Sequence, residues 1–164
     1  MLRRKFATYL EDFLQRQLSI NESTEIGLDG RKILLVNGAR QIGKSYLIRY
    51  VGKKMFKNYV EIDLREDKEH DRNFADVRST EAFYIQLSAI AGDRLNNRHD
   101  TLVFLDEIQS YPHLLTLLKF LNQEGKYTYV ASGSQLGVAL AQTSSVPIGS
   151  VEIQQMYPKY YNKS

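Results

Sequence analysis

The chain has 164 residues, 43% of them hydrophobic, and a formal net charge of +3, which fits one globular domain with or without an added helix. The absence of cysteine excludes disulfides and thiolate catalysis, and three widely spaced histidines make no ligand pattern. Mild basicity permits phosphate contacts without indicating a nucleic-acid surface, and no apolar run reaches the length of a membrane span. We therefore expect a soluble, cytoplasmic protein.

The chain begins with a predicted amphipathic helix over residues 2–18. Apolar side chains recur there at intervals of three and four, at Leu2, Phe6, Tyr9, Leu10, Phe13 and Leu14. This face would suit packing on the domain, or a docking helix or lid on which Phe6 or Tyr9 stacks against a nucleotide base. Residues 1–30, the helix and a polar connection, are thus set apart from a domain predicted at 31–158 and a frayed tail at 159–164.

Residues 38–45 fit the pattern Gly, any four residues, Gly-Lys-Ser/Thr. They lie between an apolar strand predicted at 32–37 and a helix predicted to end near Lys54, the setting typical of a phosphate-binding P-loop. Lys44 is expected to reach the β- and γ-phosphates and the Ser45 hydroxyl to ligate Mg²⁺. The predicted nucleotide contacts are Gly38, Ala39, Arg40, Gln41, Ile42, Gly43, Lys44, Ser45 and Tyr46. Arg40 would either touch phosphate or lie in solvent.

Strands and helices alternate along the rest of the chain. Strands are predicted at 58–64, 101–105, 127–131 and 151–156. Three helices lie between them. The first follows a cap at Ser79 or Thr80, with a face of Phe83, Leu87, Ile90 and Ala91. The second runs from Pro112 to Gly125, with an inner face of Leu114, Leu115, Leu117, Leu118 and Leu121, and the third spans 136–141. This alternation indicates an α/β fold with a mostly parallel sheet.

Residues 65–78 are dense in charges of both signs. Such residues are costly to bury, so the segment is predicted to be a solvated loop. Because it follows the carboxyl end of a strand, it could also border an active site.

Two acids follow the apolar residues 102–105. A P-loop needs a carboxylate from a neighbouring strand on its metal, and Asp106 meets that need together with Ser45. Glu107 would point to the other side of the strand end and could orient or deprotonate the attacking water. At the end of the next strand, Ser134 is preferred to Ser132 for sensing the γ-phosphate or the attacking water. A Ser-Gly-Ser sequence is also common in turns that have no such role. The predicted catalytic residues are Lys44, Glu107 and Ser134, and the metal ligands Ser45 and Asp106.

The adjacent Asp and Glu favour hydrolysis of ATP, with ATP and Mg²⁺ as ligands. A kinase needs no water-activating glutamate, because its substrate hydroxyl is the nucleophile, and the guanine-reading pattern Asn-Lys-x-Asp is absent. The alternative is a nucleotide-binding switch with little turnover until a partner or a further region joins it. A small-molecule kinase is the third hypothesis. A protein partner or self-association is compatible with each of them.

The motifs together resemble those of a group of bacterial and archaeal AAA-superfamily ATPases. The matching stretches are 37–45, 104–109, 131–137, 147–149 and 156–158, within a resemblance that spans about residues 31 to 158. It implies a P-loop NTPase three-layer sandwich with a five-stranded sheet in the order 5-1-4-3-2. It also implies Walker A roles for Lys44 and Ser45, Walker B roles for Asp106 and Glu107, and a sensor role for Ser134.

Two features depart from that family pattern. Members commonly continue past the Tyr-Pro at 157–158 into a long C-terminal region, whereas this chain stops at Ser164, so we expect a truncated form or a short member without that region. Relatives often carry Arg or Lys after the glycine that corresponds to Gly149, where this chain has Ser150. Arginine fingers contribute orders of magnitude to rate, so both departures favour the switch alternative.

Overall fold

The computed structural model describes residues 3–22, 30–39, 43–143 and 149–156. Within them, five strands form one parallel sheet in the order β2-β3-β4-β1-β5. They are β1 (Ile33–Gly38), β2 (Asn58–Asp63), β3 (Thr101–Asp106), β4 (Thr128–Gly133) and β5 (Val151–Met156). This confirms the predicted α/β fold, because the order is 5-1-4-3-2 read from the other edge. The adjacent strands β3, β4 and β1 all end at the same edge of the sheet.

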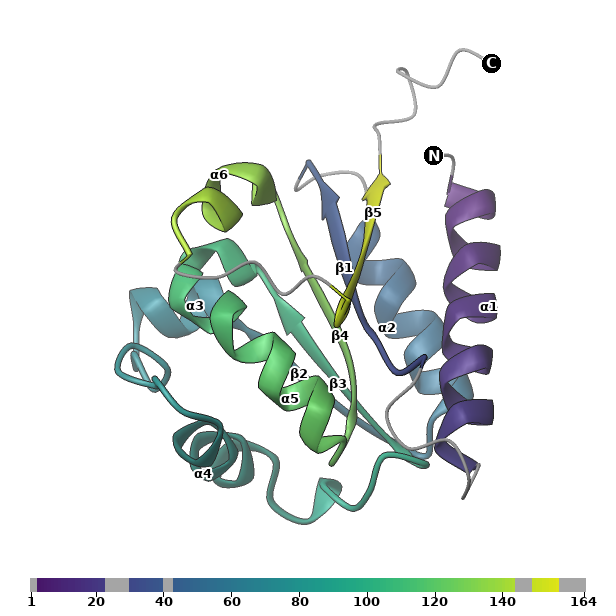
Figure 1. Cartoon of the computed structure of the whole chain (residues 1–164), viewed down its shortest axis with the longest axis horizontal. Coiled ribbons are helices and arrows are strands. Elements are labelled where there is room, and N and C mark those ends of the chain that lie inside the picture. Colours follow the sequence, from purple (N-terminus) through teal and green to yellow (C-terminus); the bar gives the residue numbers. More distant parts are fainter. Residues whose placement is uncertain (1–2, 23–29, 40–42, 144–148, 157–164) are drawn as a thin grey trace.

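Helices cover both faces of the sheet, which gives the three layers visible in Figure 1. On one face lie α1 (Arg3–Glu22) and α2 (Lys44–Met55). On the other face lie α4 (Thr80–Ala91), α5 (Leu118–Glu124) and α6 (Leu136–Ala141). Strand β3 is buried at every position, as expected for a continuous apolar run covered on both faces. None of the helices in the described ranges is both long and apolar enough to cross a membrane.

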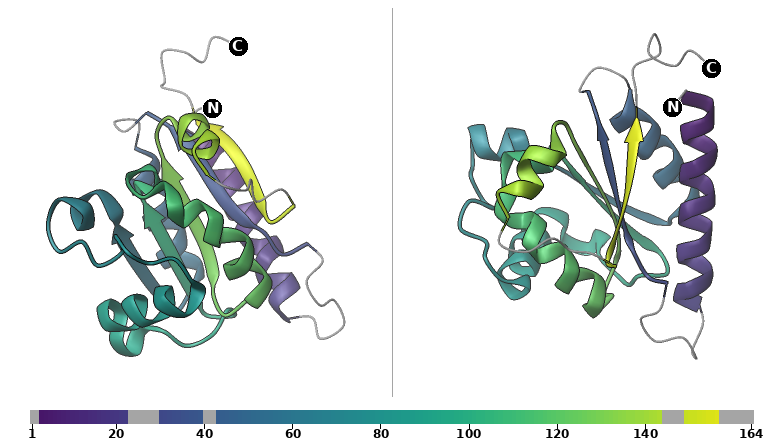
Figure 2. Two further views of the ribbon diagram at one scale, coloured as in Figure 1. Left: turned by 60° about the vertical axis from the view of Figure 1, so that its left-hand side comes forward. Right: turned by 45° about the horizontal axis from the view of Figure 1, so that its top comes forward.

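The predicted N-terminal helix is present and packs on the domain. Its side chains Phe6, Leu10, Phe13 and Leu14 are buried against α2 and the sheet, and Figure 2 shows α1 running beside β5. The Tyr9 hydroxyl donates a hydrogen bond to the Glu152 carboxylate on β5. Both residues considered for base stacking are thus engaged within the fold. The predicted division of the chain at residues 30 and 158 stays a prediction.

The helices on the other face follow their sequence signals with small differences. Ser79, rather than Thr80, caps α4 by accepting a hydrogen bond from the Ala82 N–H at 3.1 Å. Ile90 was predicted on the buried face and is 37% exposed, because the buried stripe follows Phe83, Leu87 and Ala91. The helix predicted from Pro112 begins as a 3-10 segment, Pro112–Leu117, before α5, with its leucines buried as expected. Shorter 3-10 turns lie at Gly92–Arg94 and Ile108–Ser110.

The prediction of a solvated loop over 65–78 is wrong in its first part, because α3 (Leu64–Glu69) is a helix. The Asp63 carboxylate caps it by accepting hydrogen bonds from the Arg65 and Glu66 N–H groups at 3.0 and 3.1 Å. Arg65 and Glu69 also form an ion pair one turn apart, at 3.2 Å. A polar cap and a charge pair therefore make a short helix where apolar periodicity is missing.

Asp67 is the buried carboxylate of this segment, 9% exposed. It accepts hydrogen bonds from the Asn73 and Phe74 N–H groups, each at 3.0 Å, and from the Tyr111 hydroxyl at 2.9 Å. It thereby ties α3 to the following loop and to the segment after β3. Anchoring α3 in this way also determines where the charged side chains of this helix lie relative to the strand ends.

We expect Asp67→Ala to lower the free energy of unfolding by about 2–3 kcal/mol, because it leaves buried donors without an acceptor. Tyr111→Phe is the matched control, since it removes one of the three hydrogen bonds, and should cost about 1 kcal/mol. Urea denaturation of the three proteins measures both values. Equal losses in the two variants would contradict an anchoring role for Asp67.

The tail predicted at 159–164 lies outside the described residues, as do residues 147 and 148 of the turn predicted around 147–149. So do Arg40, Gln41 and Ile42 of the predicted phosphate loop. Gly149, which is described, adopts a φ of 87° before β5.

Candidate active site

The glycine loop joins the end of β1 to the start of α2, at the edge where the strands end. Gly38 is the last residue of β1, and Gly43 precedes α2 with a φ of 80°, a left-handed conformation that disfavours any residue with a β-carbon. Because Gly43 has no side chain, it cannot cap the helix. A helix that begins directly after a glycine loop is an arrangement typical of anion binding at the helix N-terminus.

Lys44 is 1% exposed, although it is the first residue of α2. Its Nζ donates a hydrogen bond to the Ala39 carbonyl at 3.3 Å. Burial lowers the pKa of Lys44, while the negative charges of Glu107 and Asp106 act in the opposite direction. The structure thus brings the predicted phosphate-binding lysine close to both predicted acids.

Asp106 ends β3 and is 7% exposed. Its Oδ2 accepts a hydrogen bond from the Ser45 hydroxyl at 2.8 Å, and its Oδ1 accepts from the Ser132 hydroxyl at 2.8 Å and the Glu107 N–H at 2.9 Å. Burial raises the pKa of Asp106 and the nearby charges of Glu107 and Asp63 add to that effect, whereas the two hydroxyl hydrogen bonds oppose it. The predicted metal pair, Ser45 and Asp106, is therefore in direct contact.

This pair fits a magnesium ion that arrives with a nucleotide. A hydroxyl and a carboxylate are the hard oxygen ligands that Mg²⁺ prefers, and protein sites for Mg²⁺ usually supply one or two carboxylates while phosphates and water supply the rest. No cluster of three or more His, Cys, Asp or Glu side chains suited to a metal occurs among the described residues. Ser45 and Asp106 supply two oxygen ligands, which suits a site shared with phosphates and water.

Glu107 follows Asp106 in a left-handed conformation, with φ 57° and ψ 45°. This conformation is unfavourable for a residue with a side chain, and here it turns the chain from β3 into the 3-10 segment Ile108–Ser110. Glu107 is 8% exposed, and its Oε2 accepts a hydrogen bond from the Gln109 Nε2 at 2.6 Å. The left-handed backbone at Glu107, directly after an apolar strand, thus places the carboxylate of this predicted base beside Gln109.

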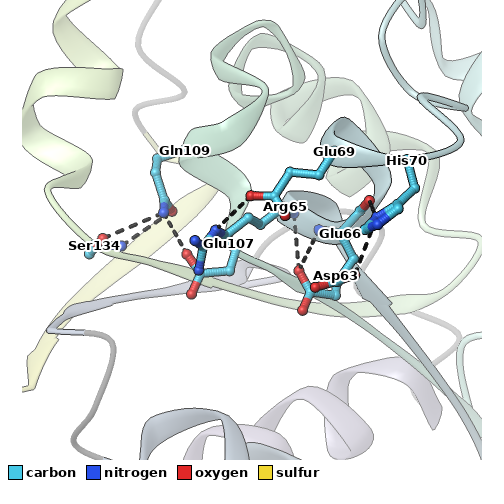
Figure 3. A network of polar contacts seen from close by, with 8 residues as sticks. All are labelled: Asp63, Arg65, Glu66, Glu69, His70, Glu107, Gln109 and Ser134. Atoms are coloured by element: carbon cyan, nitrogen blue, oxygen red, sulfur yellow. Dashed lines mark hydrogen bonds and ion pairs between the residues drawn. The ribbon is translucent and has the colours of Figure 1, made fainter.

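The Ser-Gly-Ser turn contributes two different contacts. Ser134 lies just after β4, where its N–H donates to the Gln109 Oε1 at 3.2 Å and its Oγ lies 3.4 Å from the Gln109 Nε2 (Figure 3). Ser134 was preferred to Ser132 on sequence grounds, but Ser132 is the serine that contacts Asp106. The parallel pairing of Leu105 with Ala131 makes Asp106 and Ser132 the next neighbours, and this register is not readable from sequence.

Helix α3 borders the same site, as the position of the charged segment allowed. Beside Glu107 and Gln109, an open cavity of about 450 Å³ is lined by Arg65, Lys68, Glu69 and Arg72. Tyr46, by contrast, is an exposed side chain of α2 and stacks on Tyr50 with ring centroids 6.4 Å apart.

Ser150 lies near the amino ends of the strands, whereas the residues described above lie at their carboxyl ends. Its carbonyl accepts a hydrogen bond from the N–H of Ile33, the first residue of β1, at 2.9 Å, whereas the glycine loop follows the last residue of that strand. One strand length of about 20 Å separates the two ends. A basic side chain at position 150 would therefore lie far from the glycine loop of the same chain, and the serine found there takes nothing away from that site.

The fold and this constellation define a P-loop domain, with a glycine loop after β1 and an acidic pair at the end of β3. The chain belongs to a family of AAA domains: the sequence model described as AAA domain matches residues 30–162. No curated protein matches the chain in sequence.

Two solved structures share the fold. The ORC2 protein of Aeropyrum pernix, determined as ADPNP-ADP complexes, matches with a TM-score of 0.59 and 17% identity over 94% of this chain. PCH-2 of C. elegans matches with a TM-score of 0.55 and 13% identity, also over 94% of this chain. The chain spans 48% and 42% of the lengths of these two structures. At this identity the likeness is one of fold.

Proposed function

We propose that this domain binds Mg²⁺ and ATP in the cytoplasm and hydrolyses the ATP to ADP and phosphate. The observation that carries the proposal is the 2.8 Å contact between the Ser45 hydroxyl and the Asp106 carboxylate, made beside a buried Lys44. In the sequence, the glycine loop alone separates the end of β1 from Lys44, the first residue of α2. The ORC2 structure, which has the same fold, is a complex with ADPNP and ADP, and supports the assignment of an adenine nucleotide.

In this proposal the loop and α2 bind the phosphates. Residues 38–43 and the N-terminus of α2 offer N–H groups to the phosphate chain. Lys44 exchanges its contact with the Ala39 carbonyl for β- and γ-phosphate oxygens. Ser45 and Asp106 would hold Mg²⁺, which would supply positive charge to neutralise the phosphates.

Glu107 acts as the general base on the attacking water. As the water oxygen bonds to the γ-phosphorus, Glu107 accepts the water proton, and the bond from the γ-phosphorus to the bridging oxygen of ADP breaks. The products are ADP and inorganic phosphate. Ser134, on the neighbouring strand end, is placed in this proposal to sense the γ-phosphate or the water.

The second candidate is a nucleotide-dependent switch that turns over little by itself. Its remaining support is the open, charged cavity beside Glu107, where a protein partner or a second copy could complete the site. The position of Ser150 gives it no support within one chain. A small-molecule kinase is the third candidate.

Incubation of the protein with Mg²⁺ and γ-labelled ATP separates the three candidates. The hydrolysis proposal predicts label in inorganic phosphate, at a rate that EDTA abolishes. Bound nucleotide without release of phosphate would select the switch. Label transferred to an added acceptor and not to water would select the kinase.

A further inference from the structure

The side-chain amide of Gln109 joins the ends of two neighbouring strands. Its Nε2 donates to the Glu107 Oε2 at 2.6 Å, and its Oε1 accepts from the Ser134 N–H at 3.2 Å. Figure 3 shows the three side chains directed toward one another. A backbone N–H can only donate and an ionised carboxylate can only accept, so these two partners fix which end of the amide faces which strand.

Two unusual backbone features make room for this amide. A β-carbon on Gly133 would lie 2.2 Å from the Gln109 Oε1, so only glycine lets the amide approach β4 this closely. On the other side, the left-handed backbone of Glu107 brings its carboxylate within reach of the Gln109 Nε2. Such local strain persists where the surrounding contacts determine it, and it is common at functional sites.

We propose that Gln109 is a positioning residue for Glu107, an inference that rests on the proposed hydrolysis of ATP. The amide holds one carboxylate oxygen and so sets the orientation of the Glu107 carboxylate toward the attacking water. Because the other end of the amide is bound to Ser134, the orientation of Glu107 depends on the position of the turn after β4. A movement of that turn when the γ-phosphate binds would therefore reach the base through Gln109.

The kinetic test compares Gln109→Met and Gln109→Glu with the wild type by phosphate release. Met keeps the length without polar atoms, and Glu keeps the shape but replaces the donor with an acceptor. Both should lower kcat by about 10–100-fold and change KM by less than about threefold, because the loss is in orientation of the base. Gln86→Met, in the half-buried face of α4, is the control and should match the wild type.

Gly133→Ala displaces the amide while Gln109 itself is retained. It should reproduce the fall in kcat, and a wild-type kcat in this variant would contradict the proposal. In a Glu107→Gln background, Gln109→Met should cause no further loss of the residual single-turnover rate, measured with enzyme in excess. A further loss as large as in the wild type would show that Gln109 acts independently of Glu107.

A readout without turnover uses the side-chain amide of Gln109 in 15N-labelled protein. Its NH₂ protons should exchange slowly with water in the wild type and rapidly in Glu107→Ala. Rapid exchange in the wild type would overturn the contact itself. Hydrolysis that is unaffected in Gln109→Met would overturn only the positioning role. No hydrolysis by a wild type with a protected amide would instead refute the proposed function, and with it the role of Gln109 in hydrolysis, while the contact stands.

Discussion

Replacing Glu107 by glutamine is expected to lower the rate of ATP hydrolysis by about 10²–10⁴-fold, the usual contribution of a general base. Glutamine has the same shape but cannot accept the proton of the attacking water. Affinity for the nucleotide should stay within a few-fold, because the proposed phosphate and metal ligands are untouched. Phosphate release and a nucleotide titration on the same preparation measure both quantities.

Glu69→Gln is the matched control for charge, because Glu69 lines the same cavity but pairs with Arg65 on the exposed side of α3. It should hydrolyse ATP at close to the wild-type rate. Equal rates for wild type and Glu107→Gln would remove Glu107 from its role. An equal loss in both variants would instead indicate a general effect of charge in the cavity.

Lys44→Ala is expected to lose nucleotide binding by about 100-fold or more. Two charge-assisted contacts to phosphate are worth about 3 kcal/mol together, and every 1.4 kcal/mol is tenfold in Kd. A ligand at about 100 times its Kd stabilises the folded state by about 2.7 kcal/mol, so the wild type should unfold at a higher temperature with Mg²⁺ and ATP. Lys44→Ala should show no such shift.

Lys54→Ala on the last turn of α2 removes an exposed lysine from the same helix and should behave as the wild type. Thermal unfolding of the three proteins with and without nucleotide makes the comparison. A full upward shift in Lys44→Ala would place the nucleotide elsewhere on the chain.

The fold was predictable from sequence where apolar residues recur with the period of a helix or a strand, or form a continuous run. The helix at 136–141 and the strand at 151–156 have the predicted bounds, and β3 extends the predicted strand by one residue, Asp106. Helix α3 was missed because its stability comes from the Asp63 cap and from Asp67, whose partner Tyr111 lies 44 residues away. The contact between Asp67 and Tyr111 exists only once the chain has folded.

The site was predictable in its motifs and less so in its connections. The glycine loop and the acidic pair identify Lys44, Ser45, Asp106 and Glu107, and the structure brings these four residues together. Ser132 was ranked behind Ser134, and Gln109 was not singled out as a site residue, because their contacts depend on the register of β4 beside β3 and on the left-handed turn at Glu107. A sequence gives the order of such residues but not which of their atoms meet.

Calorimetric titration of the wild-type chain with ATP, in the presence and absence of Mg²⁺, tests the central claim most directly. The proposed site predicts saturable binding of one ATP per chain, tightened by Mg²⁺ and stronger than the binding of GTP under the same conditions. Absence of binding to Mg²⁺ and ATP at millimolar nucleotide would contradict the assignment of residues 38–45 and Asp106 to an ATP site.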